Sequence, residues 1–259
     1  MTLWVRFEHE GKAGFGLLAQ NAIEVHTGSM FESPKATGHS VPLSAARLLR
    51  PAEPTKMIAL WNNFHALAAK LKSPVPAEPL YFIKNPGSFA DPGAIVHRPA
   101  AYDGKVVYEG ELGIVIGKSC HNASEEEAAA AIFGYTCVND ITAADIISRD
   151  ATFAQWTRAK GFDGFGPFGP VIATGLDAAT LVVKTWVNGE ERQNYPIADM
   201  VFPAAALVAK ISADMTLLPG DIVSFGTSLG VGTMKLAENT VEIEIEGIGI
   251  LHNTFVQTT

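Results

Sequence analysis

Glu109 and Glu111 stand one residue apart in the segment YEGELGIVIG, which spans residues 108–117. β-branched and aromatic residues dominate this segment and a glycine closes it, so it is predicted to form a strand. Side chains alternate along a strand, which would place both glutamates and Gly113 on one face, opposite an apolar face. Two like charges beside a core need either water or a cation between them. The pair is therefore either a solvated strand face or part of a metal site.

A third carboxylate, Asp140, lies in the segment GYTCVNDITAAD, residues 134–145. It ends a predicted apolar strand at the point where the backbone turns. Such a rigid strand end is a common position for a functional group, although an isolated aspartate is also a turn former or a helix cap. Together with Glu109 and Glu111, Asp140 would complete an all-oxygen site, which suits Mg²⁺, Mn²⁺ or Ca²⁺ better than zinc.

Two glycine-rich segments could bring charge and backbone donors to a substrate. Lys160 enters the segment AKGFDGFGPFGP, residues 159–170, which is interpreted as a loop. Its apolar neighbours favour a desolvated cation that faces an anion, with an ordinary exposed lysine as the alternative. The segment GTSLGVG, residues 226–232, follows a predicted strand. Its glycines would let backbone N–H groups approach a carboxylate closely, although a simple glycine-rich turn has the same spacing.

The composition is typical of a compact globular enzyme. The chain has 259 residues, of which 47% are hydrophobic and 18% charged, so it can bury a large core. A net charge of −8 argues against nucleic-acid binding. No apolar run approaches the length of about 18 residues that a membrane span needs, and the first residues lack the pattern of a signal peptide. Cys120 and Cys137 have no C-x-x-C partner, which indicates reduced thiols and a cytoplasmic location.

The elements that must position these residues are mostly strands. Residues 1–50 are predicted to form a small β unit, and the two prolines of residues 51–54 mark a linker. Helices are expected over residues 62–71, 124–133 and 202–211, the second starting with capping-box spacing at Ser124 and Glu127. Further strands are expected at residues 56–61, 80–83, 95–98, 222–225, 240–246 and 250–255. Strands outnumber helices, which favours an all-β or α+β core over a doubly wound sheet.

The order of motifs resembles that of the fumarylacetoacetate hydrolase family, which includes acylpyruvases and related decarboxylases, isomerases and lyases. The resemblance covers roughly residues 56–257 and combines many short motifs in sequential order. The matching stretches are YEGEL at 108–112, GY at 134–135, ND at 139–140, AAD at 143–145, KGFD at 160–163, VNGE at 187–190, Gln193, DMVF at 199–202, LPGD at 218–221, GTSLGVG at 226–232 and EGIG at 246–249.

This resemblance implies an α+β, mainly β fold of the mixed β-sandwich roll type. It implies a small N-terminal β subdomain over residues 1–52, a catalytic domain over residues 53–259, a homodimer, and one divalent cation, typically Mg²⁺, per active site. It assigns the metal-ligand role to Glu109, Glu111 and Asp140, the same carboxylates that the strand pattern singles out.

The resemblance also assigns roles around the metal. Lys160 matches the catalytic lysine of the family, and Thr227, next to Gly226, matches the threonine that helps to hold the substrate carboxylate. His65 occupies the place of the general base in a lid segment. A histidine without such a role, at the start of an ordinary helix, is the alternative.

Several positions depart from the family pattern. A glutamate usually follows the lid histidine by three positions in hydrolytic members, and here that residue is Ala68. The arginine often found within the Asp140 segment is replaced by Ala144. Arg149, or Arg158, could supply the missing anion contact, although both are equally compatible with ordinary surface charges.

These residues predict a Mg²⁺- or Mn²⁺-dependent hydrolase that cleaves a C–C bond in a 2,4-dioxo acid of the acylpyruvate or fumarylpyruvate type, in aromatic or carboxylic acid catabolism. Decarboxylation of a 2-oxo diacid, or keto–enol isomerisation, on the same metal-enolate site is the first alternative, and Ala68 favours it. A non-catalytic metal-binding homologue is the second alternative. No nucleic acid or membrane partner is expected.

Overall fold

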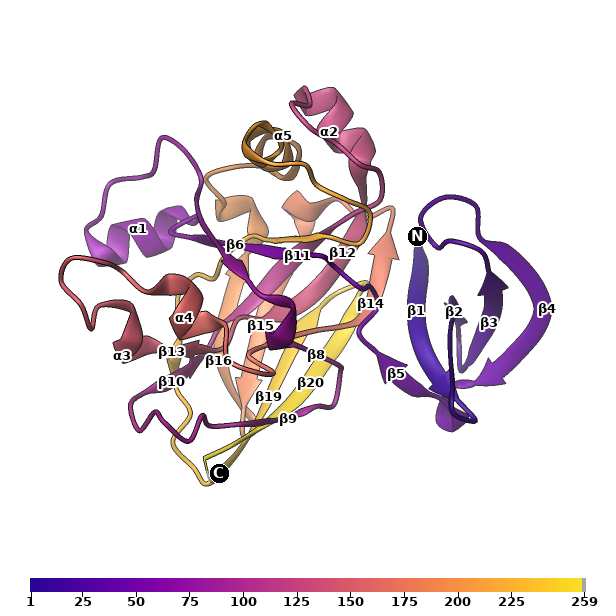
Figure 1. Ribbon diagram of the computed structural model, residues 1–259, viewed down its shortest axis with the longest axis horizontal. Coiled ribbons are helices and arrows are strands. Elements are labelled where there is room, and N and C mark those ends of the chain that lie inside the picture. Colours follow the sequence, from indigo (N-terminus) through magenta and orange to yellow (C-terminus); the bar gives the residue numbers. More distant parts are fainter. Residues whose placement is uncertain (258–259) are drawn as a thin grey trace.

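The structure is a computed structural model that describes residues 1–257 and is built mainly from strands (Figure 1). The helices are α1 His65–Leu71, α2 Glu125–Ala131, α3 Ala144–Ile147, α4 Trp156–Lys160 and α5 Ala204–Asp214. The strands are β1 Thr2–His9, β2 Lys12–Ala19, β3 Ala22–Thr27, β4 Lys35–Pro42, β5 Arg47–Leu49, β6 Met57–Trp61, β7 Leu80–Lys84, β8 Phe89–Ala90, β9 Ile95–His97, β10 Val106–Tyr108, β11 Gly110–Ile116, β12 Ile132–Asn139, β13 Thr142–Ala143, β14 Gly166–Thr174, β15 Val182–Val187, β16 Glu190–Pro196, β17 Ile222–Ser224, β18 Gly232–Thr233, β19 Glu238–Ile245 and β20 Gly249–Val256.

Two large sheets pack against each other and confirm the predicted α+β, mainly β fold class. The first sheet has the strand order β4-β3-β2-β1-β14-β12-β11-β17-β6-β7, and the second has the order β16-β15-β19-β20-β9. Strands β11, β12 and β14 of the first sheet contact β15, β19 and β20 of the second. Apolar side chains from the facing surfaces fill the space between the sheets, as expected for a β-sandwich. A third, small sheet joins β13, β10 and β18.

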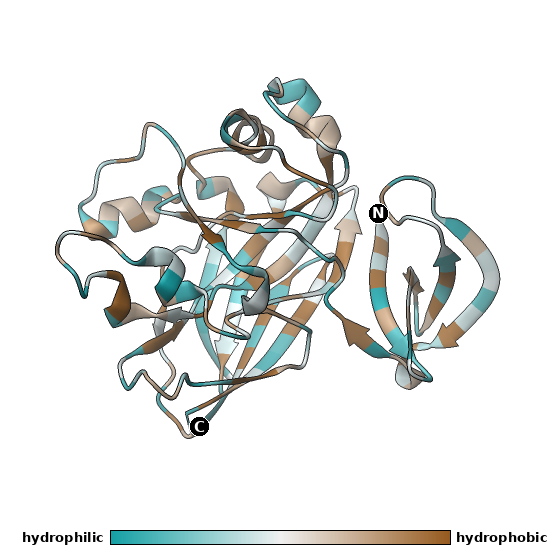
Figure 2. Ribbon diagram, viewed as in Figure 1, coloured by the Kyte–Doolittle hydropathy of each residue, from teal (hydrophilic) through white to brown (hydrophobic). Residues whose placement is uncertain are grey.

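The N-terminal strands form a distinct curved unit at one side of the molecule (Figure 1). β1 alternates apolar and polar residues, which is visible as alternating colours along the strand in Figure 2. β1 pairs with β2 and β5 on one side and with β14 of the main body on the other. The first sheet therefore runs without a break through the predicted boundary between residues 52 and 53, and the division into two domains stays a prediction.

Most predicted elements lie within a few residues of the observed ones, and the exceptions have physical reasons. The helix predicted from residue 124 begins with the expected capping box, in which Ser124 and Glu127 bond to each other's backbone N–H groups. It ends at Ala131 rather than at residue 133, because the next residues begin β12. The helix predicted from residue 62 begins only at His65, since Asn62 has a left-handed backbone with φ of 57°. No described helix is long and apolar enough to cross a membrane.

The segment interpreted as a loop over residues 159–170 is instead split between two elements. Lys160 is the last residue of α4, and Gly166 is the first residue of β14. Proline rarely occurs within a sheet because it donates no backbone hydrogen bond, and this segment has two prolines. Pro170 lies where the pairing of β14 with β12 is irregular, between Tyr135 and Cys137, and Pro167 is the second residue of β14, where the strand pairs with the short β8.

Candidate metal centre and active-site cavity

The antiparallel pairing of β11 with β12 brings the three predicted metal ligands together. Gly110 lies opposite Asn139 in this register, so the neighbouring residues Glu109 and Asp140 meet at the end of the ladder. The backbone N–H of Asp140 donates to the carbonyl oxygen of Glu109 at 2.9 Å. Glu109 itself lies between β10 and β11, where the chain passes from the small sheet to the first large sheet. The predicted single strand over residues 108–117 is therefore interrupted at the first glutamate.

Glu109, Glu111 and Asp140 form the acidic cluster. Each offers a carboxylate oxygen, and these three oxygens lie within 4.8 Å of one another. Glu111 and Asp140 are fully buried, whereas the side chain of Glu109 is 16% exposed. The alternative of a solvated strand face is therefore wrong for this pair of glutamates. Buried carboxylates this close together require counter-charges.

Two lysines supply part of that counter-charge. Lys160 Nζ lies 2.6 Å from Glu109 Oε2 and 2.5 Å from Asp140 Oδ2. Lys84, the last residue of β7, is fully buried, and its Nζ lies 2.7 Å from Asp140 Oδ1. The Lys84 ammonium also donates to the backbone carbonyl of Lys160 at the end of α4. When all three carboxylates are ionised, they outnumber the two ammonium groups, and the acidic cluster carries an excess of negative charge.

Glu111 has one oxygen that fits a cation. The hydroxyl of Ser224 donates to Glu111 Oε2, and the register that sets Ser224 of β17 opposite Gly113 of β11 positions it there. Glu111 Oε1 is buried and has no hydrogen-bond partner among the described residues. A buried carboxylate oxygen without a donor is costly unless a cation binds it. The donor set is made of hard oxygens, so the residues present fit Mg²⁺, Mn²⁺ or Ca²⁺.

The pKa values of the cluster follow from burial and from the two ammonium groups. Burial raises the pKa of Glu111 well above its usual range, and repulsion from Asp140 and Glu109 adds to the shift. For Asp140, burial alone would raise the pKa, but the charges of Lys160 and Lys84 outweigh burial and lower it. Burial opposes the charge of Lys160, yet the carboxylates around it raise its pKa above the usual lysine range. The contacts with Glu109 and Asp140 therefore favour the charged form of Lys160.

A cavity of about 170 Å³ opens over the acidic cluster. Glu109, Lys160 and Thr227 contribute the polar part of its lining, with Asn62 at one side. Apolar side chains form the rest of the wall, and they are Leu60, Trp61, Leu67, Leu71, Phe82 and Val231.

Thr227 and its neighbours fix the backbone of Gly110, between the two glutamates. The Thr227 hydroxyl donates to the carbonyl oxygen of Gly110 at 3.1 Å and accepts from Gln193 Nε2 at 2.8 Å. Gln193 Oε1 accepts from the N–H of Gly110 at 2.9 Å, and the Tyr195 hydroxyl donates to the Gly110 carbonyl at 2.6 Å. Gly226 has φ of 81°, and a Cβ there would come within 2.6 Å of the carbonyl oxygen of Leu60. Thr227 thus contacts the backbone between the two glutamates, and Gly226 beside it has no room for a side chain.

Three predicted residues lie elsewhere. His65 is exposed at the first turn of α1 and does not line the cavity, to which α1 contributes two leucines instead. Arg149 is exposed, and its guanidinium lies 5.9 Å from the ring centre of Tyr102. Arg158 is also exposed and donates to Gln155 Oε1 at 3.0 Å. In this conformation, none of the three reaches the cavity over the acidic cluster.

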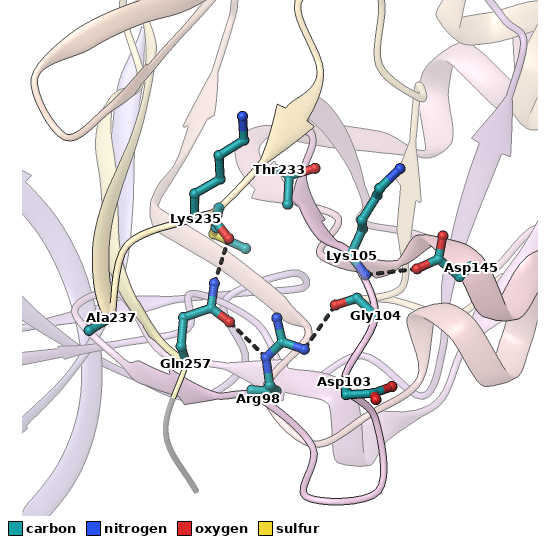
Figure 3. Close-up of a pocket in the computed structure, with 10 residues that line it drawn as sticks. Arg98, Asp103, Gly104, Lys105, Asp145, Thr233, Lys235, Ala237 and Gln257 are labelled. Atoms are coloured by element: carbon teal, nitrogen blue, oxygen red, sulfur yellow. Dashed lines mark hydrogen bonds between the residues drawn. The ribbon is translucent and has the colours of Figure 1, made fainter.

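A second, larger cavity of about 680 Å³ is lined mostly by polar and charged residues (Figure 3) and shares no lining residue with the cavity over the acidic cluster. Arg98, which lines this cavity, donates hydrogen bonds to the side-chain oxygen of Gln257 and to the carbonyl oxygen of Gly104. The carboxylate of Asp145, part of one of the family motifs, accepts from the backbone N–H of Lys105 at 2.8 Å. Asp145 thus anchors the loop that leads into β10 and contributes no ligand to the acidic cluster.

Two family profiles match the chain in succession. The profile described as "Rv2993c-like, N-terminal" matches residues 3–51, and "Fumarylacetoacetate (FAA) hydrolase C-terminal" matches residues 56–256. The chain belongs to the fumarylacetoacetate hydrolase family. This membership confirms the resemblance that the motifs carry.

Relatives within the fumarylacetoacetate hydrolase family differ in their reactions. The crystal structure of 2-hydroxyhepta-2,4-diene-1,7-dioate isomerase from Mycobacterium marinum is 36% identical over 99% of each chain, with a TM-score of 0.90. Oxaloacetate tautomerase YisK of Bacillus subtilis is 36% identical over 224 residues, which are 82% of this chain and 73% of YisK. Maleylpyruvate hydrolase from Sphingobium sp. SYK-6, solved with a manganese(II) ion and pyruvate, is 28% identical over the whole of both chains, with a TM-score of 0.80. The family is enzymatic and has metal-dependent members that act on small oxo acids.

Sequence reasoning missed Lys84 and Ser224, although both contact the acidic cluster. Ser224 carries a weak signal, because it is a polar residue within the apolar strand before the glycine-rich segment. The signal for Lys84 is a lysine directly after the apolar run of β7, in front of Asn85 and Pro86. Such a lysine more often points to solvent, so only the packing of α4 onto β7 identifies its role.

Proposed function

We propose that the protein is a divalent-metal-dependent hydrolase that cleaves a C–C bond in a 2,4-dioxo acid. The observation that carries this proposal is the acidic cluster itself, which combines an unpartnered buried oxygen of Glu111 with the ammonium group of Lys160 at a cavity. The related maleylpyruvate hydrolase, solved with manganese and pyruvate, supports the same pairing of metal and oxo acid. The expected homodimer and cytoplasmic location stay predictions.

Glu109, Glu111 and Asp140 would hold the cation, which supplies Lewis acidity toward the oxygens of the 2-oxo acid when bound. In the proposed reaction, water adds to the C4 carbonyl and the C3–C4 bond breaks. The electron pair of that bond passes to the pyruvate fragment as its enolate, which takes up a proton to give pyruvate. The other product is the carboxylic acid of the acyl group. Lys160 places a positive charge where the enolate oxygen develops.

The remaining residues bind the substrate and move the proton of water. Thr227 and the backbone at Gly226 would hold the carboxylate end of the substrate beside the acidic cluster. His65 would accept the proton of the attacking water. Because His65 is exposed at the start of α1, this role requires the helix to bring His65 toward the cavity.

Parallel assays of the metal-loaded protein on acetylpyruvate and oxaloacetate test the proposal, with diketone absorbance and CO₂ release followed separately. We expect loss of the diketone with formation of pyruvate and acetate. Lys160→Met should lower kcat by at least about 100-fold, since one electrostatic contact to a developing oxyanion is worth that much. His65→Ala should lower hydrolysis, and the exposed His39 of β4 offers a matched control, His39→Ala. Absence of diketone loss with either Mg²⁺ or Mn²⁺ would refute the hydrolase.

Decarboxylation of a 2-oxo diacid is the second candidate, and the position of His65 favours it. Loss of CO₂ generates the enolate without an attacking water, so it needs no base beside the substrate. Ala68, at the position where hydrolytic members have a glutamate, is buried on α1 and offers no orienting carboxylate. CO₂ release from oxaloacetate without diketone loss, unchanged in His65→Ala, would establish this reaction instead. Absence of both reactions in the metal-loaded protein, with 2-oxo acid binding weakened in Lys160→Met, would point to a non-catalytic metal-binding protein.

A further inference from the structure

Three aromatic side chains lie directly beside the acidic cluster. Trp156, at the start of α4, stacks on Phe82 of β7 with ring centres 5.7 Å apart and planes at 13°. Trp61, the last residue of β6, lies 5.7 Å from Trp156 by the same measure. The ammonium of Lys160, which binds two of the carboxylates, lies 5.0 Å from the centre of the Phe82 ring. This aromatic cluster of Trp61, Phe82 and Trp156 therefore begins one side chain away from the acidic cluster.

The aromatic cluster borders two cavities. Trp61 and Phe82 line the cavity over the acidic cluster, and together with Trp156 they also line an adjoining cavity of about 450 Å³. Among the described residues, Glu109 and Lys160 are the only charged side chains that line either cavity. The walls of both cavities are therefore mainly apolar, and the residues that the two cavities share are aromatic.

These apolar residues determine which substrate tails can bind favourably beyond the acidic cluster. Lys160 already binds two carboxylates, so a further carboxylate on the substrate tail would be desolvated without a cation to pair with. A planar apolar tail would instead exchange water for contact with aromatic rings, which favour offset stacking and edge contacts. Half-exposed rings such as Trp61 and Trp156 can make such contacts without rearranging the core.

We propose that the aromatic cluster is the subsite for the acyl tail of the substrate, and that it selects an uncharged, planar apolar tail over a tail that ends in a second carboxylate. This inference rests on the proposed function, because it is a 2-oxo acid head bound at the acidic cluster that directs the tail to the aromatic cluster. It narrows the substrate class to acylpyruvates with an apolar acyl group.

Inert 2-oxo acids can test the tail separately from the reaction, since they lack the C4 carbonyl that hydrolysis requires. The probes are 2-oxo-4-phenylbutanoate and 2-oxoglutarate, which share a head and a two-carbon spacer and differ in a phenyl or carboxylate end. Pyruvate and oxalate serve as ligands without a tail. Binding to the full-length, Mg²⁺-loaded protein is measured by calorimetry. We expect the phenyl compound to bind about tenfold tighter than pyruvate, and 2-oxoglutarate no tighter than pyruvate.

Three variants test whether the aromatic cluster is the source of the effect. Trp156→Leu should remove most of the gain from the phenyl group and leave oxalate affinity unchanged, whereas Trp186→Leu, at a half-buried tryptophan of β15 outside both cavities, should change neither. Leu71 lines the cavity and is 47% exposed, so an arginine is tolerated there. Leu71→Arg should tighten 2-oxoglutarate binding about tenfold by supplying the missing cation.

The possible outcomes distinguish a failure of the tail subsite from a failure of the proposed function. If oxalate binds in a Mg²⁺-dependent way but 2-oxoglutarate binds as tightly as the phenyl compound, the proposed function stands and the tail subsite is overturned. An unchanged phenyl gain in Trp156→Leu also overturns it. If neither oxalate nor any 2-oxo acid binds, the proposed function fails and the tail subsite fails with it. Should Trp156→Leu not fold, the comparison of ligands on the unmodified protein and on Leu71→Arg decides the question.

Discussion

Replacing Lys84 by methionine is expected to destabilise the metal-free protein by about 4 kcal/mol. Lys84 is fully buried, and its ammonium binds Asp140 and the carbonyl of Lys160. Each of these acceptors would be left buried without its donor, at a cost of about 1–3 kcal/mol apiece. The sum agrees with the range of about 3–5 kcal/mol for breaking one side of a buried ion pair. Methionine has a similar length and is apolar, so a new cavity adds little.

Thermal unfolding followed by circular dichroism measures this change. At about 2–4 °C per kcal/mol for a chain of this size, Lys84→Met should lower the Tm by about 8–16 °C. Saturating Mg²⁺ should narrow the difference, because a bound cation gives Asp140 a new positive neighbour. The exposed Lys118 provides the control, and Lys118→Met should leave the Tm within about 2 °C of the parent protein.

A double variant isolates the ion pair from other effects of the substitution. In Lys84→Met/Asp140→Asn the charge that Lys84 neutralises is gone, so the combined loss of stability should be smaller than the sum of the two single losses. Additive losses would show that Lys84 does not stabilise Asp140. A Tm for Lys84→Met equal to that of Lys118→Met would refute the assignment of Lys84 to the acidic cluster altogether.

Two further changes test contacts around the acidic cluster, and a third tests the loop that leads into β10. Ser224→Ala removes the donor to Glu111 and should weaken Mg²⁺ binding about 10–100-fold by calorimetry, with Ser119→Ala as an exposed control. Gly110→Ala would place a Cβ 2.1 Å from Thr185 Oγ1 and should cost about 1–3 kcal/mol in urea unfolding, most of it recovered in Gly110→Ala/Thr185→Ala. The hydrogen bond from the Lys105 N–H lowers the pKa of Asp145, so its charged form stabilises the fold above its usual pKa and loses that effect as pH falls through the lowered value. Asp145→Asn should therefore lower the Tm more at pH 7 than at about pH 3, and equal losses at both pH values would contradict this account.

The acidic cluster could be predicted from the sequence because its geometry depends on short-range features. Glu109 and Glu111 are one residue apart, and Asp140 ends the strand that pairs with theirs. Neighbouring antiparallel strands bring their ends together whatever the rest of the fold does. The order of the motifs then predicted the sandwich architecture and the roles expected for Lys160 and Thr227. Residue spacing alone did not predict these features.

Features that depend on long-range packing were not predictable in this way. Lys84 reaches the acidic cluster only because β7 is the edge strand beside β6 and because α4 packs against β7. The sequence pattern of a lysine after an apolar strand is the same when the side chain points to solvent. The break between β10 and β11 at Glu109 was also missed, because β-propensity is equally high on both sides of it. Where one strand leaves its sheet depends on partners, here β13 and β18, that lie far away in the sequence.

Helix α1 carries both side chains that line the cavity and the proposed base. Leu67 and Leu71 of this helix line the cavity over the acidic cluster, and His65 stands exposed at its first turn. A tail that packs against these leucines gains contact as α1 moves inward, and the same movement carries His65 toward the substrate. Binding energy from the tail would then be used to form the catalytic arrangement and would appear in kcat.

Steady-state hydrolysis of acetylpyruvate and benzoylpyruvate tests this coupling, since the two substrates differ only in a methyl or phenyl tail. We expect the phenyl tail to raise kcat about tenfold in the parent protein, and to lose that advantage in His65→Ala, where the movement brings no base. In a rigid subsite the phenyl tail would stabilise substrate and transition state alike and would lower KM alone. A tenfold lower KM at equal kcat would therefore show that the aromatic cluster binds the tail without moving α1.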